Sequence, residues 1–199
     1  DQVHKFENKV RGYVKEIAAD QTHSTIKFLS RVLGRIFNKV FDGIEAHNLD
    51  NVRRIAATHE LIFTSAHRSP FDYLLLGSVL FDAGVQPPHT AAGINLNFWP
   101  VGNMLRRSGA FFLRRRFGGN KLYTAVFHEY IHALIQRGHS ISFYPEGGRS
   151  RNGRLLQPKI GMISMVVESF LRSSKRPILF VPVYIGYDTV AEIKSYQKE

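Results

Sequence analysis

Apolar and polar residues alternate along the chain in two patterns, which predict strands and helices in turn. Short apolar runs rich in β-branched and aromatic residues predict buried strands at 61–66, 90–94, 110–114, 140–144 and 178–185. Longer stretches with helical spacing of apolar residues predict helices at 70–82, 98–107, 120–137 and 159–172. Such alternation is typical of an α/β fold with a mostly parallel central sheet flanked by helices, and we expect that fold here.

The stretch ahead of the first predicted strand is helical in pattern. Between Thr22 and Asn48 the apolar residues keep helical spacing, and four basic residues lie off that stripe: Lys27, Arg31, Arg35 and Lys39. Such a basic amphipathic helix either packs its apolar face on the domain or lies in a membrane interface, and the pattern leaves both open. We expect an N-terminal helical segment over residues 1–50 and one α/β domain over 51–199.

Composition narrows the classes of function. The 199 residues are 44% hydrophobic, enough for the core of one domain, and the lack of cysteine excludes disulfides, thiolate metal sites and cysteine nucleophiles. A formal charge of +11 predicts an anionic partner: nucleic acid, an anionic membrane surface or a phosphorylated substrate. No apolar run reaches the roughly 18 residues of a membrane-spanning helix, and no signal peptide opens the chain. Because the chain lacks an initiator methionine, we expect it to be a piece of a longer protein.

A histidine and an aspartate flank the start of the helix that follows the first strand. His67 comes directly after Leu61 to Ala66, and Asp72 comes just after the helix-start signal Ser69-Pro70. Ligands of open α/β sheets bind beyond the carboxyl ends of the strands, and an imidazole oriented by a carboxylate can take a proton from a hydroxyl. On spacing alone, the pair is more often a loop histidine beside an aspartate that favours the helix dipole.

Three further predicted strands end in residues of interest. The strand at 110–114 runs into Arg114, Arg115 and Arg116, and a glycine-rich helix start follows. After the strand at 140–144 come Glu146, Gly147, Gly148, Arg149, Ser150 and Arg151. Guanidinium forks suit phosphate, so both are candidate anion sites, although a solvated basic loop and an ordinary turn are the alternatives. Pro182 cannot donate to a ladder, which predicts an edge or strand-start position for it.

One motif points to a different class of enzyme. His128-Glu129-Tyr130-Ile131-His132 matches the zinc-protease pattern His-Glu-x-x-His. The extended pattern fails, because Ile135 and Gly138 stand where it needs glycine and histidine. Helical geometry also turns both histidines away from the apolar stripe, so we expect them on the solvent face of their helix.

Four stretches, in order, resemble the sequence blocks of the glycerolipid acyltransferases: His67-Arg-Ser-Pro-Phe-Asp72, Gly109-Ala-Phe-Phe-Leu-Arg-Arg115, Phe143-Tyr-Pro-Glu-Gly-Gly-Arg-Ser150 and Val181-Pro-Val183. The stretches 91–100 and 117–123 are more narrowly similar to the membrane-bound bacterial glycerol-3-phosphate acyltransferases. Gly148 departs from the wider family, which more often has threonine after Glu-Gly, so we assign its side chain no role. The resemblance covers residues 60 to 190 and implies that 51–199 is the acyltransferase domain.

The resemblance implies roles for the candidate residues. His67 would deprotonate the 1-hydroxyl of sn-glycerol 3-phosphate, Asp72 would orient His67, and the alkoxide would attack an acyl thioester, from acyl-CoA or acyl carrier protein, to give lysophosphatidate. The substrate-binding residues it implies are Arg114, Arg115, Glu146, Gly147, Arg149, Ser150, Arg151 and Pro182. It implies no metal or resident cofactor. Without cysteine, and with no serine in a Gly-x-Ser-x-Gly elbow, an acyl-enzyme is not needed.

Several alternatives stay open. Related acyltransferases that act on dihydroxyacetone phosphate or lysophosphatidate share these blocks. A basic nucleic-acid-binding module would also account for the charge, but no helix-turn-helix, zinc-finger or aromatic RNA-binding signature is present, so we expect no nucleic-acid partner. The charge and the amphipathic helix together predict a peripheral or monotopic protein on the cytoplasmic face of the bacterial inner membrane.

Overall fold

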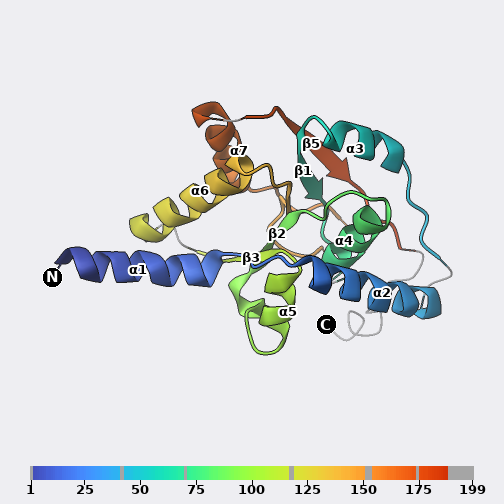
Figure 1. Cartoon of the computed structure of the whole chain (residues 1–199), viewed down its shortest axis with the longest axis horizontal. Helices are drawn as coiled ribbons and strands as arrows, with labels where there is room; N and C mark the ends of the chain where they lie inside the picture. Colours follow the sequence, from blue (N-terminus) through green and yellow to red (C-terminus); the bar gives the residue numbers. More distant parts are fainter. Residues whose placement is uncertain are drawn as a thin grey trace.

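Five parallel strands form one sheet at the centre of the molecule (Figure 1). The computed structural model describes residues 2–40, 43–69, 71–116, 119–150, 154–173 and 175–187. The strands are β1 (Glu60–Ser65), β2 (His89–Gly93), β3 (Ala110–Leu113), β4 (Ile141–Phe143) and β5 (Ile178–Val183), in the spatial order β3-β2-β4-β1-β5. Because every pairing is parallel, all five carboxyl ends meet at one edge of the sheet. The predicted α/β fold is confirmed.

The register of the sheet sets the neighbours of the residues that follow β1. β1 lies between β4, with Ile62 opposite Ile141, and β5, with Ser65 opposite Val183. The chain after β1 therefore emerges between the ends of β4 and β5. Pro182 stands opposite Thr64 on the edge strand β5, as predicted for a residue without a backbone donor.

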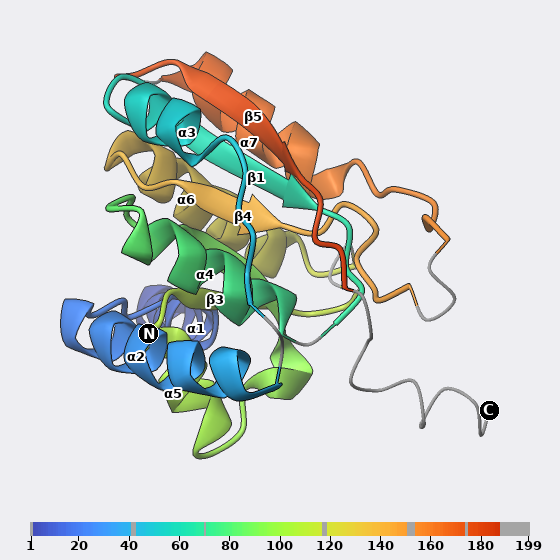
Figure 2. The same ribbon diagram turned by 90° about the vertical axis from the view of Figure 1, so that its right-hand side faces the viewer.

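Helices cover both faces of the sheet (Figure 2). Their bounds are α1 (Gln2–Ile17), α2 (His23–Val40), α3 (Leu49–Ala56), α4 (Asp72–Asp82), α5 (Val101–Arg107), α6 (Lys121–Gln136) and α7 (Gly161–Arg172), with a short 3₁₀ turn, η1 (Ile94–Leu96). Ile62 packs in the core under α6 and α7, whereas its neighbours Leu61 and Phe63 pack under α3 and α4. This alternation is what a strand buried on both faces requires.

The N-terminal helices differ from the prediction. The helix expected over 22–48 ends at Val40, and residues 43–47 are not helical. Gly43 and Asn48 both have positive φ, which a continuing right-handed helix does not accommodate, and α3 begins directly afterwards. Leu33 and Phe37 of α2 are buried in a cluster with Leu74 of α4, so the apolar stripe packs on the domain.

Helix α1 runs outward from the domain, with its N-terminal end farthest away (Figure 1). Its C-terminal end is anchored, because Ile17 is fully buried in the core cluster that includes Phe127 of α6. The boundary predicted at residue 50 stays a prediction. Among the helices that the structure describes, none has the length and apolarity needed to cross a membrane.

Candidate active site

His67 and Asp72 form a hydrogen-bonded pair at the carboxyl edge of the sheet. His67 Nδ1 lies 2.9 Å from Asp72 Oδ2. The backbone N–H groups of Arg68 and Ser69 donate to the same oxygen, at 2.7 and 2.9 Å, and the hydroxyl of Tyr187 donates to Oδ1 at 2.6 Å. The first turn of α4 thus presents a carboxylate that is surrounded by donors.

The surroundings of Asp72 keep it ionised. Its side chain is completely buried, and burial alone would raise the pKa. The hydrogen bonds from His67, Tyr187, Ser69 and Arg68 outweigh burial, and the pKa lies below its ordinary value of 3.8. An ionised Asp72 accepts the Nδ1 proton of His67, which leaves the lone pair on Nε2.

The ring of His67 is held in place but remains reachable. Tyr144, directly after β4, stacks on it with ring centroids 4.1 Å apart and planes at 22°. The side chain of His67 is 21% exposed, and no residue in the described part of the chain bonds its Nε2. Burial raises the pKa of Tyr144 well above its ordinary value, so Tyr144 is a neutral support. Nε2 is therefore a base available to a substrate hydroxyl.

The loop after β4 is tied to this pair. The Ser150 N–H donates to the carbonyl of His67 at 2.8 Å, and the Gly147 N–H donates to the carbonyl of Tyr144 at 2.9 Å. Glu146 is buried, and its carboxylate accepts a hydrogen bond from the Leu156 N–H at 3.1 Å. Gly147 has a φ of +64°, a conformation that favours glycine. The contacts of Glu146 and Ser150 fix the loop beside His67, and their roles toward substrate stay predictions.

The two predicted arginines after β3 have different surroundings. Arg114 donates from Nε and Nη2 to both carboxylate oxygens of Glu16, each at 2.7 Å, and its guanidinium lies over the rings of Tyr13 and Tyr123. Arg115 is exposed and contacts no described residue through an ion pair or hydrogen bond. The guanidinium of Arg114, which was predicted to bind phosphate, is therefore bonded to Glu16 instead. This ion pair joins α1 to the end of β3.

The remaining predicted residues are placed as follows. Arg149 is partly buried in the loop beside His67 and has interactions of its own. Pro182 lies on β5, which pairs with β1, and it comes two residues before Tyr184, the first residue after the strand. Arg151 lies outside the described residues.

The His-Glu-x-x-His pattern lies on α6, but the prediction that both histidines face solvent was wrong, because both are partly buried, with His128 Nε2 and His132 Nδ1 shielded from solvent. His128 Nε2 is 3.3 Å from Glu168 of α7, and the His128 side chain is 27% exposed. Glu129 forms an ion pair with Arg172 of α7. Over the described ranges, no group of three or more His, Asp or Glu side chains is placed to hold a metal ion.

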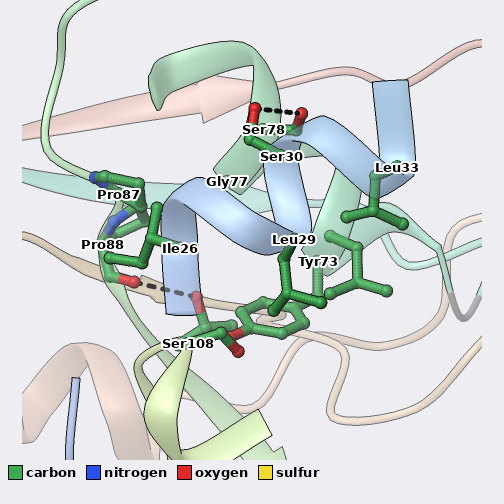
Figure 3. Close-up of a pocket in the computed structure, with 12 residues that line it drawn as sticks. Ile26, Leu29, Ser30, Leu33, Tyr73, Gly77, Ser78, Pro87, Pro88 and Ser108 are labelled. Carbon is green, nitrogen blue, oxygen red and sulfur yellow. Dashed lines mark hydrogen bonds between the residues drawn. The ribbon is translucent and has the colours of Figure 1, made fainter. Parts of the chain in front are cut away.

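A small recess lies between α2 and α4 (Figure 3). Leu29, Leu33 and Leu74 supply apolar walls, and the Tyr73 hydroxyl in it is paired with the Ser108 hydroxyl at 2.6 Å. None of the predicted site residues lines it. The recess is therefore separate from the His67 and Asp72 pair.

Sequence reasoning missed four contributors to the site. Tyr144, Tyr187 and the backbone N–H groups of Arg68 and Ser69 all contact His67 or Asp72. The sequence carried no signal for the two tyrosines, because the strand pairing that sets the ends of β4 and β5 beside that of β1 is visible only in the structure.

A comparison with protein families decides the family. The model described as Acyltransferase matches residues 43–186, which include all five strands and every predicted site residue. The chain belongs to the acyltransferase family. The pair, the arginines and the loop after β4 are thus features of an acyltransferase domain.

Full-length relatives of this acyltransferase domain carry a more specific name. Proteins of Pseudoalteromonas atlantica (53% identical over 197 residues), Alteromonas mediterranea (54% over 190) and Pseudomonas putida (53% over 195) are each called glycerol-3-phosphate acyltransferase. The alignments cover 98%, 95% and 98% of this chain, but only 24%, 23% and 24% of the relatives. This chain thus spans about a quarter of the length of these relatives.

Proposed function

We propose that this chain is the acyl-transfer core of a glycerol-3-phosphate 1-O-acyltransferase. It would move a fatty acyl group from acyl-CoA or acyl carrier protein to the 1-hydroxyl of sn-glycerol 3-phosphate, giving lysophosphatidate, the first step of phospholipid synthesis. The observation that carries the proposal is the 2.9 Å contact between His67 and a fully buried Asp72, which leaves Nε2 as the base. The names of the relatives at about 53% identity support the choice of acceptor.

The reaction needs only these groups and two substrates. Nε2 of His67 takes the proton of the 1-hydroxyl as the oxygen attacks the thioester carbonyl. The carbon–oxygen ester bond forms, the carbon–sulfur bond breaks as the intermediate collapses, and the imidazolium returns its proton to the thiolate leaving group. Asp72 stabilises the imidazolium between these steps. We propose no acyl-enzyme and no metal or resident cofactor.

The acceptor phosphate would bind Arg115 and Arg149. Arg149 follows β4, the neighbour of β1, whereas Arg115 follows β3, three strand positions from β1, or roughly 14 Å at about 4.8 Å per strand. In the proposed complex, the Arg115 side chain would extend from the end of β3 toward the space beyond β4. Arg114 is bonded to Glu16, so we propose only a minor role for it in binding the phosphate. Glu146, Gly147, Ser150, Arg151 and Pro182 remain predicted contributors to the substrate pocket.

Removal of either phosphate-binding arginine should weaken acceptor binding selectively. We expect Arg115→Ala and Arg149→Ala each to cost about 2 to 3 kcal/mol, which raises the KM for glycerol 3-phosphate roughly 30- to 150-fold. The KM for the acyl donor should change far less. Steady-state kinetics with each substrate varied in turn checks this, and Arg116→Ala is the matched control. Equal increases in both KM values would show that the arginines support the fold.

A panel of acceptors tests the proposed function. The chain is given one acyl-CoA and, in separate reactions, glycerol 3-phosphate, dihydroxyacetone phosphate, lysophosphatidate or glycerol. Glycerol 3-phosphate should have the highest kcat/KM, and the product should carry its ester at the 1-position. A higher kcat/KM with dihydroxyacetone phosphate or lysophosphatidate would replace the proposed acceptor. Glycerol should react poorly, because it offers no phosphate to the arginines.

We also propose that the protein binds the cytoplasmic face of the bacterial inner membrane. The outer side of α2 exposes Phe28 (63%) and Ile36 (43%) beside Arg31 and Arg35. Trp99 (82% exposed) comes just ahead of α5, and α5 lies beside α2 (Figures 1 and 2). Exposed aromatic and aliphatic groups among basic ones suit an anionic lipid interface. Such a surface would also receive the poorly soluble lipid product.

Vesicle sedimentation checks this attachment. The chain should bind vesicles containing anionic lipid, more weakly as salt rises, and the triple charge reversal of Arg31, Arg35 and Lys39 to glutamate should reduce binding at least tenfold. The control reverses three other exposed residues: Arg53 and Arg54 of α3, and Lys175 just ahead of β5. Both α3 and β5 lie on the opposite side of the molecule from α2 (Figure 1). Equal losses in both triple variants would contradict a role for this particular face.

A further inference from the structure

The segment after β5 reaches back to the catalytic pair. The Tyr187 hydroxyl donates to Asp72 Oδ1 at 2.6 Å, across 115 positions of sequence. Tyr187 is itself partly buried. A second contact fastens the same segment, since the guanidinium of Arg68 lies over the ring of Tyr184, with Cζ 5.1 Å from the centroid. The end of β5 is thus joined to the loop between β1 and α4.

The hydrogen bonds of Asp72 are divided unevenly between its two oxygens. Oδ2 receives His67 Nδ1 and the N–H groups of Arg68 and Ser69, whereas the described donor to Oδ1 is Tyr187. The carboxylate is completely buried, so a lost hydrogen bond at Oδ1 would not be replaced freely by bulk water. A hydroxyl that donates to an ionised oxygen at 2.6 Å is a short, charge-assisted hydrogen bond.

We infer that Tyr187 is a positioning residue for the reaction, acting through Asp72. By holding Oδ1, it fixes the rotation of the carboxylate about its Cβ–Cγ bond, so that Oδ2 faces Nδ1 of His67. His67 is then correctly oriented as the base only while Tyr187, in the segment after β5, contacts Asp72. This inference rests on the proposed function for its kinetic consequences, but the contact itself can be tested without substrate.

The hydroxyl can be removed while the ring is kept. Tyr187→Phe should lower kcat about 10- to 100-fold and change the KM of each substrate less than threefold, because the hydroxyl is bonded to Asp72 and would act through it. Tyr184→Phe is the matched control, since its hydroxyl lies 3.4 Å from the Arg68 guanidinium and away from Asp72. We expect kcat of Tyr184→Phe to stay within twofold.

A double-mutant cycle separates positioning from general support of the fold. If Tyr187 acts through Asp72, adding Tyr187→Phe to Asp72→Asn should lower kcat by less than a further twofold. Independent, multiplying losses would overturn the inference and leave Tyr187 as a packing residue. An unchanged kcat in Tyr187→Phe alone would overturn it as well.

Proton NMR of the ligand-free chain gives a readout that does not depend on the activity. The Nδ1 proton of His67, hydrogen-bonded to a carboxylate, should resonate at low field and should shift or broaden in Tyr187→Phe but not in Tyr184→Phe. An unchanged resonance would overturn the inference. A shifted resonance in a chain that transfers no acyl group would instead uphold the Tyr187 contact and reject the proposed function.

Discussion

Replacement of His67 with alanine is expected to lower kcat by three to four orders of magnitude, because it removes the group that takes the proton of the acceptor hydroxyl. The affinity for glycerol 3-phosphate should stay within a few fold, since the phosphate would be held by arginines that follow other strands. Single-turnover kinetics, together with equilibrium binding of glycerol 3-phosphate, measures the two effects separately.

The control for this variant addresses the rival zinc motif. His132→Ala should leave kcat within twofold, because His132 lies on α6 and outside the site built by β1, β4 and β5. A zinc enzyme built on His128 and His132 would give the reverse result. Retention of more than a tenth of wild-type turnover in His67→Ala would remove His67 from the role of base.

Asp72→Asn is expected to damage both turnover and stability. The amide cannot accept from Nδ1 of His67 and the N–H groups of Arg68 and Ser69 as the carboxylate does. If its NH₂ faces His67, the proton moves to Nε2 and the base is lost, so we expect kcat to fall about 10²- to 10⁴-fold. A buried mismatch of donors should lower the free energy of unfolding by about 2 kcal/mol.

The pH dependence of stability gives this variant a distinctive signature. Because the folded pKa of Asp72 is below 3.8, the carboxylate stabilises the fold at pH values above about 4 and ceases to do so as the pH falls through the folded pKa. Urea unfolding at pH 7 and pH 3 should therefore show a smaller loss of stability on acidification for Asp72→Asn than for the wild type. Equal acid losses in the two proteins would show that Asp72 is not the ionised, hydrogen-bonded group described above.

Local pattern predicted the elements well, because each strand here is a short, continuously apolar run between polar or glycine-rich turns. All nine strands and helices predicted over 61–185 are present with ends within three residues of the expected positions. The same pattern predicted too long a helix at α2. Apolar residues keep helical spacing past Val40, but Gly43 and Asn48 have positive φ. Backbone conformation at such points is not visible in hydrophobic periodicity.

The pair of His67 and Asp72 could be predicted because one strand end and one helix start, five residues apart, fix both side chains. The residues that surround this pair could not be predicted from the sequence. Glu16 meets Arg114 across 98 positions, and Tyr187 meets Asp72 across 115, so spacing along the chain gives no sign of either contact. Only the parallel order of the sheet brings the ends of β3, β4 and β5 toward the end of β1.

Direct transfer from thioester to glycerol 3-phosphate is the central claim, and acceptor dependence tests it most directly. The chain is incubated with palmitoyl-CoA alone and with labelled sn-glycerol 3-phosphate added, and free CoA, labelled lipid and intact protein mass are measured. We predict equal amounts of CoA and labelled lysophosphatidate when the acceptor is present, and an unmodified protein mass without it. An acylated chain, acceptor-independent release of CoA, or no lysophosphatidate in the complete reaction would contradict the account.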